Sequence, residues 1–392
     1  MKILILSQYF WPENFRIIDI ANFLKKKDKV YVVTSIPSYP NKKYFKNFNN
    51  KRKIRNLEIL RTPVFRRSYS KLSIFFNYLS FTIISFFYLL YFFLFKKIDR
   101  LFVFGTSPPS SLFSAVFFNF FKRTKIVYWI LDLWPDTLRD LGYIKSKGLF
   151  KIFNRLLIFF YNKCDLILCQ SKTITNIIKK RATTQTKYFP SWCEDEYLVK
   201  KKSQNKKKKN LQIYFSGNIG KAQDIPSVTN AIKLLRKQNI VWNFIGTGSE
   251  INYLKDKIKN LNLQSKVRFY GKVSNSKAAN LLKNADLLLF SLSKQKTFSY
   301  TIPGKLQNYL GLGKPIVGMI NGEANRLINN NNLGLACKAS DFKSLARNII
   351  KIKKMKNKKK ELLSANCLNF VEKNFLKSKL LNKLRNDYIK KV

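Results

Sequence analysis

Short, nearly continuous apolar runs recur along the chain, and longer helical stretches separate them. Strands that are apolar on both sides, rather than on alternate residues, are typical of a parallel sheet covered by helices on both faces. The first half therefore predicts a doubly wound α/β domain. Its strands are expected at Lys2–Ser7, Val30–Ser35, Leu57–Arg61, Leu101–Phe104, Lys125–Ile130 and Asp165–Cys169, and its helices near Arg16–Lys26, Ser110–Phe121 and Lys147–Asn162.

The same rhythm restarts after a break. The break begins at Phe189–Trp192 and ends in the lysine-rich stretch Lys200–Asn210. With 392 residues, the chain exceeds the size at which one core keeps growing. We therefore expect a domain at 1–190, a linker at 191–210, a second doubly wound domain at 211–375 that faces the first across a cleft, and a C-terminal helix within 376–392. The second-half strands are expected at Leu211–Ser216, Val241–Gly246, Val267–Tyr270, Ala285–Ser291 and Pro315–Met319.

The formal charge of +54 raises the question of nucleic-acid binding. The lysines are scattered over polar helix faces, and no helix-turn-helix, RRM or KH signature is present. We therefore expect no nucleic-acid partner. An AT-rich coding sequence explains the lysine and asparagine content best, and attraction to anionic lipid head groups is the second interpretation.

Histidine is absent from the sequence. Proton transfer near neutral pH must then use a carboxylate, a lysine, a tyrosine or the substrate. The cysteines form no C-x-x-C pair, so we expect no metal site and no cofactor, and reduced, mostly buried thiols in a cytoplasmic protein. They are Cys164, Cys169, Cys193, Cys337 and Cys367. Met1–Ser7 holds only enough apolar residues for one strand, which argues against a secretory signal.

Leu72–Phe95 is a run of 24 residues without a charge, and its length and composition suit a membrane helix. Arg66, Arg67 and Lys71 precede it, and Lys96 and Lys97 follow it. Three interpretations remain open: a helix in or against the membrane surface, which we favour, an ordinary buried helix, and a true span. A span would place strands of one sheet on opposite sides of a bilayer.

Three loops of the second half begin where strands are expected to end. Gly217–Gly220 and the following Lys221 suit a diphosphate, because glycine lets backbone amides approach an anion closely. Gly246–Ser249 resembles a second such turn, and Pro303 is expected to begin a helix whose free amides face the cleft. The first two have the alternative interpretation of a plain structural turn, but together the three predict a ligand with phosphates and hydroxyls.

Polar and aromatic loops follow two strands of the first half. Asp132–Asp136 (DLWPD) follows one strand, and Gln8–Arg16 follows the first. Carboxylates accept hydrogen bonds from sugar hydroxyls, and an indole ring stacks on an apolar sugar face. The alternative for Asp132–Asp136 is an acidic helix cap.

These motifs, in this order, resemble glycosyltransferase family 4, and within it the bacterial N-acetylfucosamine transferases of O-antigen and colanic-acid-type polysaccharide synthesis. The resemblance implies a GT-B fold, a nucleotide-diphosphate-sugar donor, retention of configuration, no required metal, and a final helix that returns to the first domain. It rests on Ser7–Arg16, Thr34–Pro40, Thr106–Pro109, Asp132–Asp136, Ser216–Asp224 and Thr301–Pro315.

The resemblance also implies functional residues. For catalysis we expect Asp132, Lys221 and Glu13, and for the acceptor Asn14, Arg16 and Trp134. For the donor we expect Gly217, Asn218, Gly220, Gly246, Gly248, Phe269, Gly271, Val273, Tyr300, Thr301, Pro303, Gly304, Lys305 and Asn308. The wider family places two glutamates eight residues apart where this chain has Tyr300 and Asn308.

The expected activity is transfer from a UDP-sugar to a lipid-linked saccharide at the cytoplasmic face of the inner membrane. The expected sugar is an N-acetylated deoxyhexosamine such as N-acetylfucosamine. Two alternatives remain open, a nucleotide-sugar epimerase of the same architecture and a non-catalytic membrane-associated binding protein. The hydrophobic run and the absence of histidine disfavour the epimerase, whereas the missing glutamates favour the binding protein.

Overall fold

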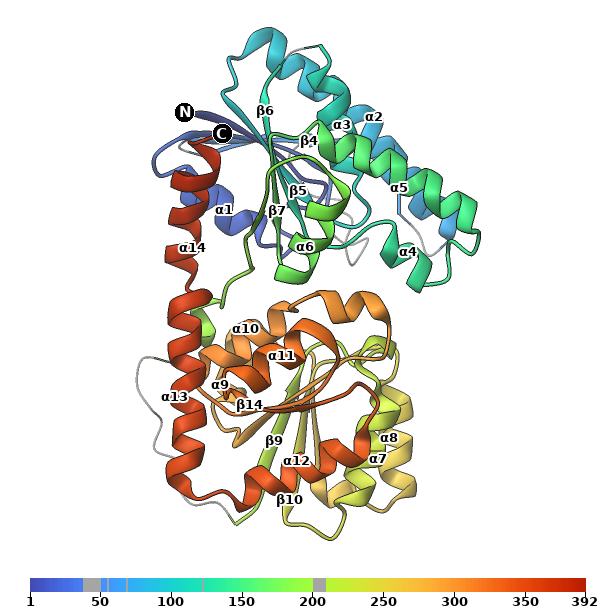
Figure 1. Ribbon diagram of the computed structural model, residues 1–392, viewed down its shortest axis with the longest axis vertical. Helices are drawn as coiled ribbons and strands as arrows, with labels where there is room; N and C mark the ends of the chain where they lie inside the picture. The colour runs from blue at the N-terminus through green and yellow to red at the C-terminus, as the bar shows by residue number, and fades with distance from the viewer. Residues whose placement is uncertain (38–50, 55, 68–69, 122, 200–208) are drawn as a thin grey trace. The chain divides into compact units, whose positions relative to one another are not determined.

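The computed structural model describes residues 1–37, 51–54, 56–67, 70–121, 123–199 and 209–392. The chain divides into two compact units (Figure 1). The first unit contains Met1–Pro190 together with Leu380–Val392, and the second contains Ser191–Lys379.

The first unit is built on an eight-stranded sheet in the order β3-β4-β2-β1-β5-β6-β7-β8. Its strands pair in parallel except for β3, which runs antiparallel to β4 at one edge. The strands are β1 (Lys2–Leu6), β2 (Lys29–Ser35), β3 (Lys51–Ile54), β4 (Leu57–Thr62), β5 (Arg100–Gly105), β6 (Lys125–Ile130), β7 (Leu166–Cys169) and β8 (Thr186–Tyr188). The sequence pattern missed β3 and β8, because an edge strand of sequence KRKI and a three-residue strand show no apolar run.

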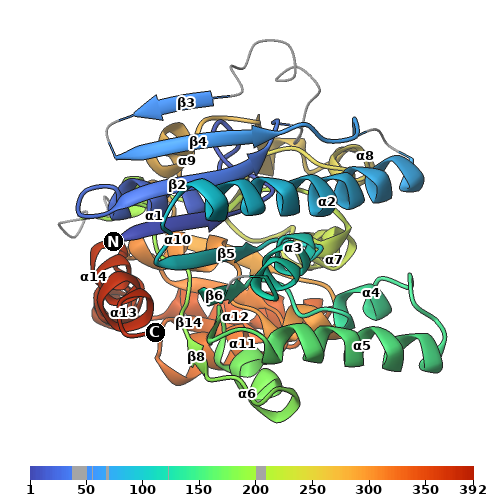
Figure 2. The same ribbon diagram turned by 90° about the horizontal axis from the view of Figure 1, so that it is seen from above.

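Helices cover this sheet, and Figure 2 shows α2, α3 and α5 one after another across the unit. Strands β1 and β5 lie in the middle of the sheet and are almost completely buried, as the continuous apolar pattern predicted. The helices are α1 (Ile17–Leu24), α2 (Lys71–Phe95), α3 (Ser110–Asn119), α4 (Asp136–Asp140), α5 (Lys147–Asn162) and α6 (Lys172–Arg181).

Helix α2 contains the uncharged run and has two different faces. On its inner face Asn77 accepts a hydrogen bond from Gln8 Nε2 at 3.0 Å, and Ser85 donates to Ser114 at 2.8 Å. The polar residues that interrupt the run are therefore structural. Its outer face is apolar and exposed, with Phe87 at 60% and Leu94 at 68% exposure. The interpretation as an ordinary buried helix is therefore wrong.

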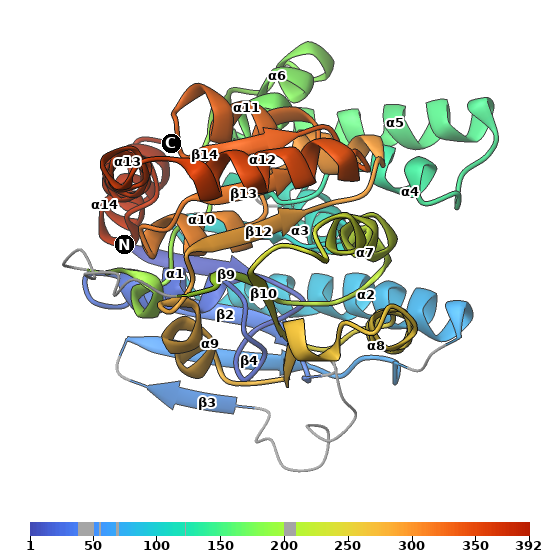
Figure 3. The same cartoon turned by 90° about the horizontal axis from the view of Figure 1, so that it is seen from below.

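The second unit has a six-stranded, fully parallel sheet in the order β11-β10-β9-β12-β13-β14 (Figure 3). Two apolar clusters lie on its two faces. Its strands are β9 (Leu211–Ser216), β10 (Ile240–Ile245), β11 (Val267–Gly271), β12 (Leu287–Ser291), β13 (Ile316–Met319) and β14 (Gly334–Cys337). Its α-helices are α7 (Ile225–Leu234), α8 (Ile251–Asn260), α9 (Asn275–Leu282), α10 (Gly304–Gly311), α11 (Gly322–Asn330), α12 (Phe342–Lys354) and α13 (Asn357–Asn374). The prediction of two doubly wound sheets is confirmed.

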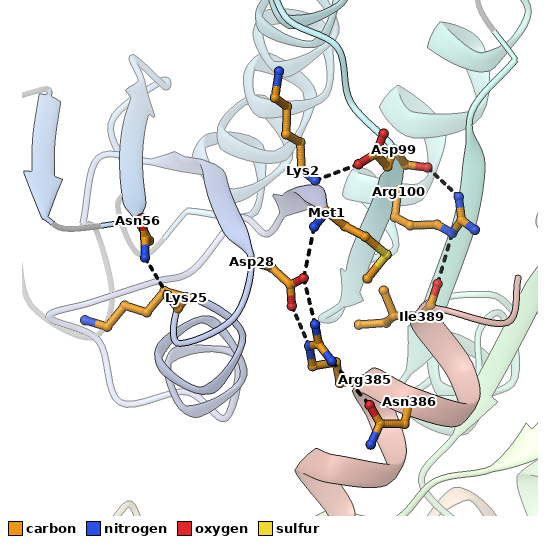
Figure 4. A network of polar contacts seen from close by, with 10 residues as sticks. All are labelled: Met1, Lys2, Lys25, Asp28, Asn56, Asp99, Arg100, Arg385, Asn386 and Ile389. Atoms are coloured by element: carbon orange, nitrogen blue, oxygen red, sulfur yellow. Dashed lines mark hydrogen bonds and ion pairs between the residues drawn. The ribbon is translucent and has the colours of Figure 1, made fainter.

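The C-terminal segment is less regular than the single helix expected from its pattern. Helix α14 (Lys377–Lys383) passes into a π-helical turn, η6 (Leu384–Ile389). This turn packs on the first unit, where Arg385 reaches Asp28 and the Arg100 side chain donates to the carbonyl of Ile389 (Figure 4). The Tyr388 ring lies edge-on to Phe189, with 5.8 Å between the ring centroids.

Candidate functional site

The second unit contains a cavity of about 400 Å³ at the carboxyl ends of its strands. In a doubly wound sheet this edge is where ligands bind, beside the point at which the strand order reverses. Here the order reverses between β9 and β12. The lining residues come from the loops after β9, β10 and β11 and from helix α10, and include Gly217, Asn218, Gly246, Val273, Lys305 and Asn308.

Two glycines let the loops after β9 and β10 touch. Gly217 and Gly246 have φ angles of +129° and +130°, which disfavour any residue with a side chain. A Cβ on Gly246 would lie 2.0 Å from the carbonyl oxygen of Gly217. A Cβ on Gly217 would lie 2.8 Å from Cε of Lys305. These glycines therefore bring backbone groups to the cavity wall.

In the described part of the second unit, Lys305 is the cation whose pKa is shifted furthest from its usual value. It belongs to the first turn of α10, and its ammonium lies 3.9 Å from the centroid of the Phe215 ring. Burial lowers its pKa to about 7. An anion in the cavity would favour the charged form of this lysine, since an opposite charge nearby stabilises the ammonium.

Helix α10 contributes two further side chains. Asn308 accepts a hydrogen bond from the backbone N–H of Glu194 at 3.0 Å and lines the cavity with its side chain. The hydroxyl of Tyr309 accepts from the backbone N–H of Ser216 at 2.6 Å. This hydrogen bond holds α10 against the end of β9. Lys305 lies in the first turn of α10 and beside Phe215 of β9, so both elements determine its position.

The other predicted donor residues lie around the cavity rather than in its lining. Gly271 accepts a hydrogen bond from Gly246 N–H at 2.7 Å, and Gly248 packs on Ile219. Phe269 stacks on Phe244 in the core. Lys221 begins the turn η3 (Lys221–Gln223) and is exposed. Gly220 precedes Lys221, Tyr300 ends the turn η5 (Lys296–Tyr300), and Thr301, Pro303 and Gly304 lead into α10.

Several lining residues of this cavity could not be recognised from the sequence pattern. Tyr197 comes from the turn η2 (Asp195–Tyr197), which lies within the predicted linker 191–210. Lys272 and Asn275 lie in and just after the loop that follows β11. Nothing distinguishes Lys272 in the sequence, because lysine is common throughout the chain. Its position beside the predicted Val273 was the only available signal.

The first unit has a cavity of its own, of about 510 Å³. Three loops line it: Tyr9–Phe15 after β1, Thr106 and Ser107 after β5, and Leu131 and Asp132 after β6. These strands are neighbours in the sheet and parallel, so their carboxyl ends meet at one edge. The structure thus brings Glu13, Asn14 and Asp132 together, as the loop positions predicted.

Asp132 and Glu13 are the carboxylates of this cavity. Asp132 is an exposed residue that lines the cavity, and desolvation by the surrounding protein raises its pKa above the usual value. Glu13 is almost completely buried, with 5% exposure. A carboxylate with a raised pKa binds a proton more readily than one in water, which suits it to accept a hydrogen bond from a hydroxyl group.

The second carboxylate of the DLWPD motif has another role. Asp136 is buried and accepts hydrogen bonds from both terminal nitrogens of Arg181, at 2.6 and 3.1 Å. It therefore ties α4 to α6 and is not a lining residue of the cavity. Trp134 donates from Nε1 to the hydroxyl of Ser107 at 2.6 Å, while Arg16 is the N-terminal cap of α1.

Arg67, Tyr9 and Tyr78 form one wall of this cavity and were missed as site residues. Arg67 donates to the Tyr9 hydroxyl at 2.7 Å and lies over the Tyr78 ring, 5.5 Å from its centroid. Burial and the neighbouring Tyr78 raise the pKa of Tyr9, so its phenol stays neutral. Tyr78 belongs to α2, whose apolar composition concealed this polar contact in the sequence.

Within the described ranges, no group of three or more His, Cys, Asp or Glu side chains is placed to hold a metal ion. The cysteines are free thiols, and all but the half-buried Cys337 are buried.

The two sheets, each with a cavity at its strand ends, define the fold of GT-B glycosyltransferases. The chain is similar to sucrose-phosphate synthase from Thermosynechococcus elongatus, with a TM-score of 0.78 and 12% identity over 99% of this chain and 98% of that one. It is also similar to HepE from Anabaena in complex with UDP, with a TM-score of 0.70 and 14% identity over 99% of both chains. At these identities the likeness establishes the fold.

The sequence places the second unit more narrowly. Residues 198–366 match the family model of the glycosyl transferases group 1. The chain is also 24% identical over 265 residues to the probable glycosyltransferase WbjE of Pseudomonas aeruginosa. That match covers 63% of this chain and 64% of WbjE, which is less than two thirds of the relative's length.

Proposed function

We propose that the protein is a retaining glycosyltransferase that takes its sugar from a UDP-sugar. The observation that carries the proposal is Lys305 at the second-unit cavity, within the residues that match the group 1 family model. A half-buried lysine with a pKa near 7 beside glycine-lined backbone suits the diphosphate of a nucleotide sugar. The structural neighbour HepE, which binds UDP in its complex, supports the same choice of donor.

The donor is proposed to lie along this cavity with its diphosphate at Gly217, Asn218 and Lys305. The segment Phe269–Val273 would flank the uracil, and the Asn308 amide would meet a ribose hydroxyl. Lys221 and the amides around Pro303 and Gly304 would add positive potential. Preorganised charges of this kind act most strongly where negative charge develops during the reaction.

The reaction breaks the bond between the anomeric carbon and the diphosphate oxygen of the donor. The acceptor hydroxyl oxygen then bonds to the anomeric carbon on the same face, which retains its configuration. The proton of that hydroxyl passes to the departing phosphate oxygen, so UDP leaves and no cofactor is consumed. This route needs no imidazole, which agrees with a chain that contains no histidine.

The acceptor is proposed to be a polyprenyl-diphosphate-linked saccharide of surface polysaccharide synthesis, such as O-antigen or lipopolysaccharide. Asp132 would orient or assist its hydroxyl, with Glu13 second, and Asn14, Arg16 and Trp134 would contact its sugars. Helix α2 both lines this cavity through Tyr78 and exposes an apolar face. It would therefore hold the first unit against the cytoplasmic face of the inner membrane, where such lipids lie.

The proposed sugar is an N-acetylated deoxyhexosamine such as N-acetylfucosamine. The test is UDP release from a panel of UDP-sugars with and without a detergent-solubilised polyprenyl-diphosphate saccharide. We expect release that depends on the acceptor, together with a lipid product heavier by one sugar in mass spectrometry. Sugar isomers formed from donor alone would instead show an epimerase. Donor binding without release under any condition would show a binding protein.

A further inference from the structure

Helix α5 is apolar over a wider arc than the part that is buried against the protein. Leu157, Phe160 and Tyr161 are buried against the first unit. Beside this buried face, α5 exposes further apolar side chains at helical spacing, and Ile152 is 64% exposed. The members of this stripe are Leu149, Ile152, Phe153, Leu156 and Phe159. An ordinary surface helix would carry polar residues at these positions.

The end of α3 joins this stripe to the exposed face of α2. Phe120 and Phe121 follow α3 directly, and Phe121 is 74% exposed. The Phe121 ring contacts Phe86 of α2, with 5.9 Å between centroids, and the Phe120 ring lies 6.5 Å from Phe159 of α5. Figure 2 shows the three helices side by side in the order α2, α3, α5. We call this continuous exposed apolar surface the three-helix face.

Charge on these helices is of one sign. The sequences of α2, α3 and α5 contain no aspartate or glutamate. Lys151 and Arg155 are exposed on α5. The Lys163 ammonium, just beyond α5, lies 5.7 Å from the Phe120 ring centroid and 5.4 Å from that of Phe159. Long basic side chains beside aromatic rings are typical of helices that lie in the head-group region of a membrane.

Large exposed apolar side chains are concentrated on the first unit. In the described part of the second unit, only Leu234 and Leu362 belong to this class, and they lie on separate helices. A continuous apolar surface of this extent on a water-soluble unit marks an interaction site. The absence of acidic residues among the three helices favours an anionic lipid surface over a protein partner.

We propose that α5 and the end of α3 form, together with α2, one face that docks on an anionic phospholipid bilayer. This proposal rests on the proposed function, which already places α2 against the membrane. It extends the membrane contact from α2 alone to α2, the end of α3 and α5. The apolar side chains enter the boundary between head groups and acyl chains, and the flanking lysines and arginines meet lipid phosphates. Contact through the whole three-helix face would fix the orientation of the first unit on the membrane more firmly than contact through α2 alone.

Vesicle flotation with the full chain tests this proposal without any turnover. The vesicles are phosphatidylcholine alone or phosphatidylcholine with phosphatidylglycerol. The double variant Ile152→Ser, Phe153→Ser removes the middle of the α5 stripe, and Ile83→Ser, Phe87→Ser does the same on α2. The control is Leu234→Ser, Leu362→Ser, which removes two comparably exposed apolar side chains from the second unit.

We expect the α5 variant to bind phosphatidylglycerol vesicles at least about tenfold more weakly than the unchanged protein, and the control to bind normally. Binding should also weaken at high salt and without the anionic lipid. Circular dichroism of each variant checks its folding. An α5 variant that binds like the unchanged protein while the α2 variant does not would overturn the proposal.

Two further results would also overturn it. Loss of a dimer in light scattering, with lipid binding unchanged in the α5 variant, would assign the stripe to a second copy of the chain. Resistance of the membrane-bound protein to a carbonate wash would show that α2 spans the bilayer. UDP release with a detergent-solubilised acceptor is measured separately, so failure of docking and failure of the proposed transferase activity are distinguishable.

Discussion

Arg385 donates two hydrogen bonds to the carboxylate of Asp28, from Nε at 2.6 Å and from Nη2 at 3.0 Å, although 357 residues separate the two in the chain. Asp28 is fully buried at its side chain, and Arg385 nearly so. Burial opposes ionisation of Asp28, but the hydrogen bonds and charge of Arg385 contribute to holding the pKa of this carboxyl below its usual value. The pair fastens the C-terminal turn η6 to the first unit.

Replacing Arg385 by methionine should destabilise the first unit by about 3 kcal/mol, because it leaves a buried carboxylate without its main partner. Urea unfolding followed by circular dichroism measures this change. The control is Lys391→Met, which removes the exposed ion pair with Asp387 and should cost less than about 1 kcal/mol. Equal effects of the two substitutions would contradict the structural role of Arg385.

The contribution of this pair should depend on pH in one direction. A carboxyl whose pKa is lowered by folding stabilises the protein above the unfolded pKa of about 3.9, and this stabilisation is lost as pH falls through the lower folded value. The difference in unfolding free energy between the unchanged protein and Arg385→Met should therefore be constant from about pH 5 to 7 and shrink below about pH 4. A difference that grows on acidification would exclude this ion pair as its source.

Binding of a UDP-sugar should weaken as the pH rises above about 7, because Lys305 has a pKa of about 7 in the free protein. Below this pH the ammonium is already formed. Above it, binding must take up a proton, and the affinity falls by up to about tenfold per pH unit until the pKa of the bound state is reached. Calorimetry in two buffers of different ionisation enthalpy measures the proton uptake.

The matched variant for this titration is Lys305→Arg, since a guanidinium stays charged throughout this range. It should bind the UDP-sugar with little pH dependence and no proton uptake at this position. Lys305→Met should bind weakly at every pH. The proposed role of Lys305 would be contradicted if the UDP-sugar affinity of the unchanged protein and that of Lys305→Arg depended on pH in the same way.

Lys221→Ala should lower turnover by orders of magnitude while leaving the fold intact. Lys221 is exposed at the start of η3, so its removal opens no cavity in the core. Steady-state UDP release measures the effect, and thermal unfolding serves as the control. Near-normal activity would falsify a leaving-group role for Lys221 and leave Lys305 as the main cation at the diphosphate.

Asp132→Asn and Asp136→Asn should separate chemistry from stability within one motif. Asp132→Asn should lower turnover about 100-fold or more, with donor affinity and unfolding nearly unchanged, because it removes the carboxylate that orients the acceptor hydroxyl through a hydrogen bond. Asp136→Asn should instead lower stability, since its carboxylate binds Arg181. Steady-state kinetics and urea unfolding of both variants check this, and the reverse pattern would assign the acceptor role to Asp136.

The two sheets could be predicted from the sequence because burial on both faces imposes a local pattern. Strands such as Lys125–Ile130 are apolar at nearly every position, and this pattern does not depend on which strand lies alongside. The strand β3 follows no such rule, since it lies at the edge of the sheet formed by the described strands. Its basic sequence therefore carries no strand signal.

The loops of the two cavities were also visible in the sequence, since parallel strands present their carboxyl ends at one edge. This rule is enough to indicate Glu13 and Asp132 in the first unit, and Gly217 and Gly246 in the second. It does not distinguish Asp132 from Asp136, which lie in one short motif. The tertiary structure separates them, because Arg181 of a distant helix forms an ion pair with Asp136, whereas Asp132 lines the cavity.

What the sequence alone determined was the periodic part of the protein: two parallel sheets, their glycine loops, and one long uncharged helix. What only the tertiary structure decided depends on residues far apart in the chain. The low pKa of Lys305 comes from burial beside Phe215, the wall of the first cavity needs Arg67 against Tyr9, and the three-helix face needs α5 beside α3. Periodicity reports the burial of a residue along its own element, whereas electrostatics and exposed surfaces arise from neighbours that only folding brings together.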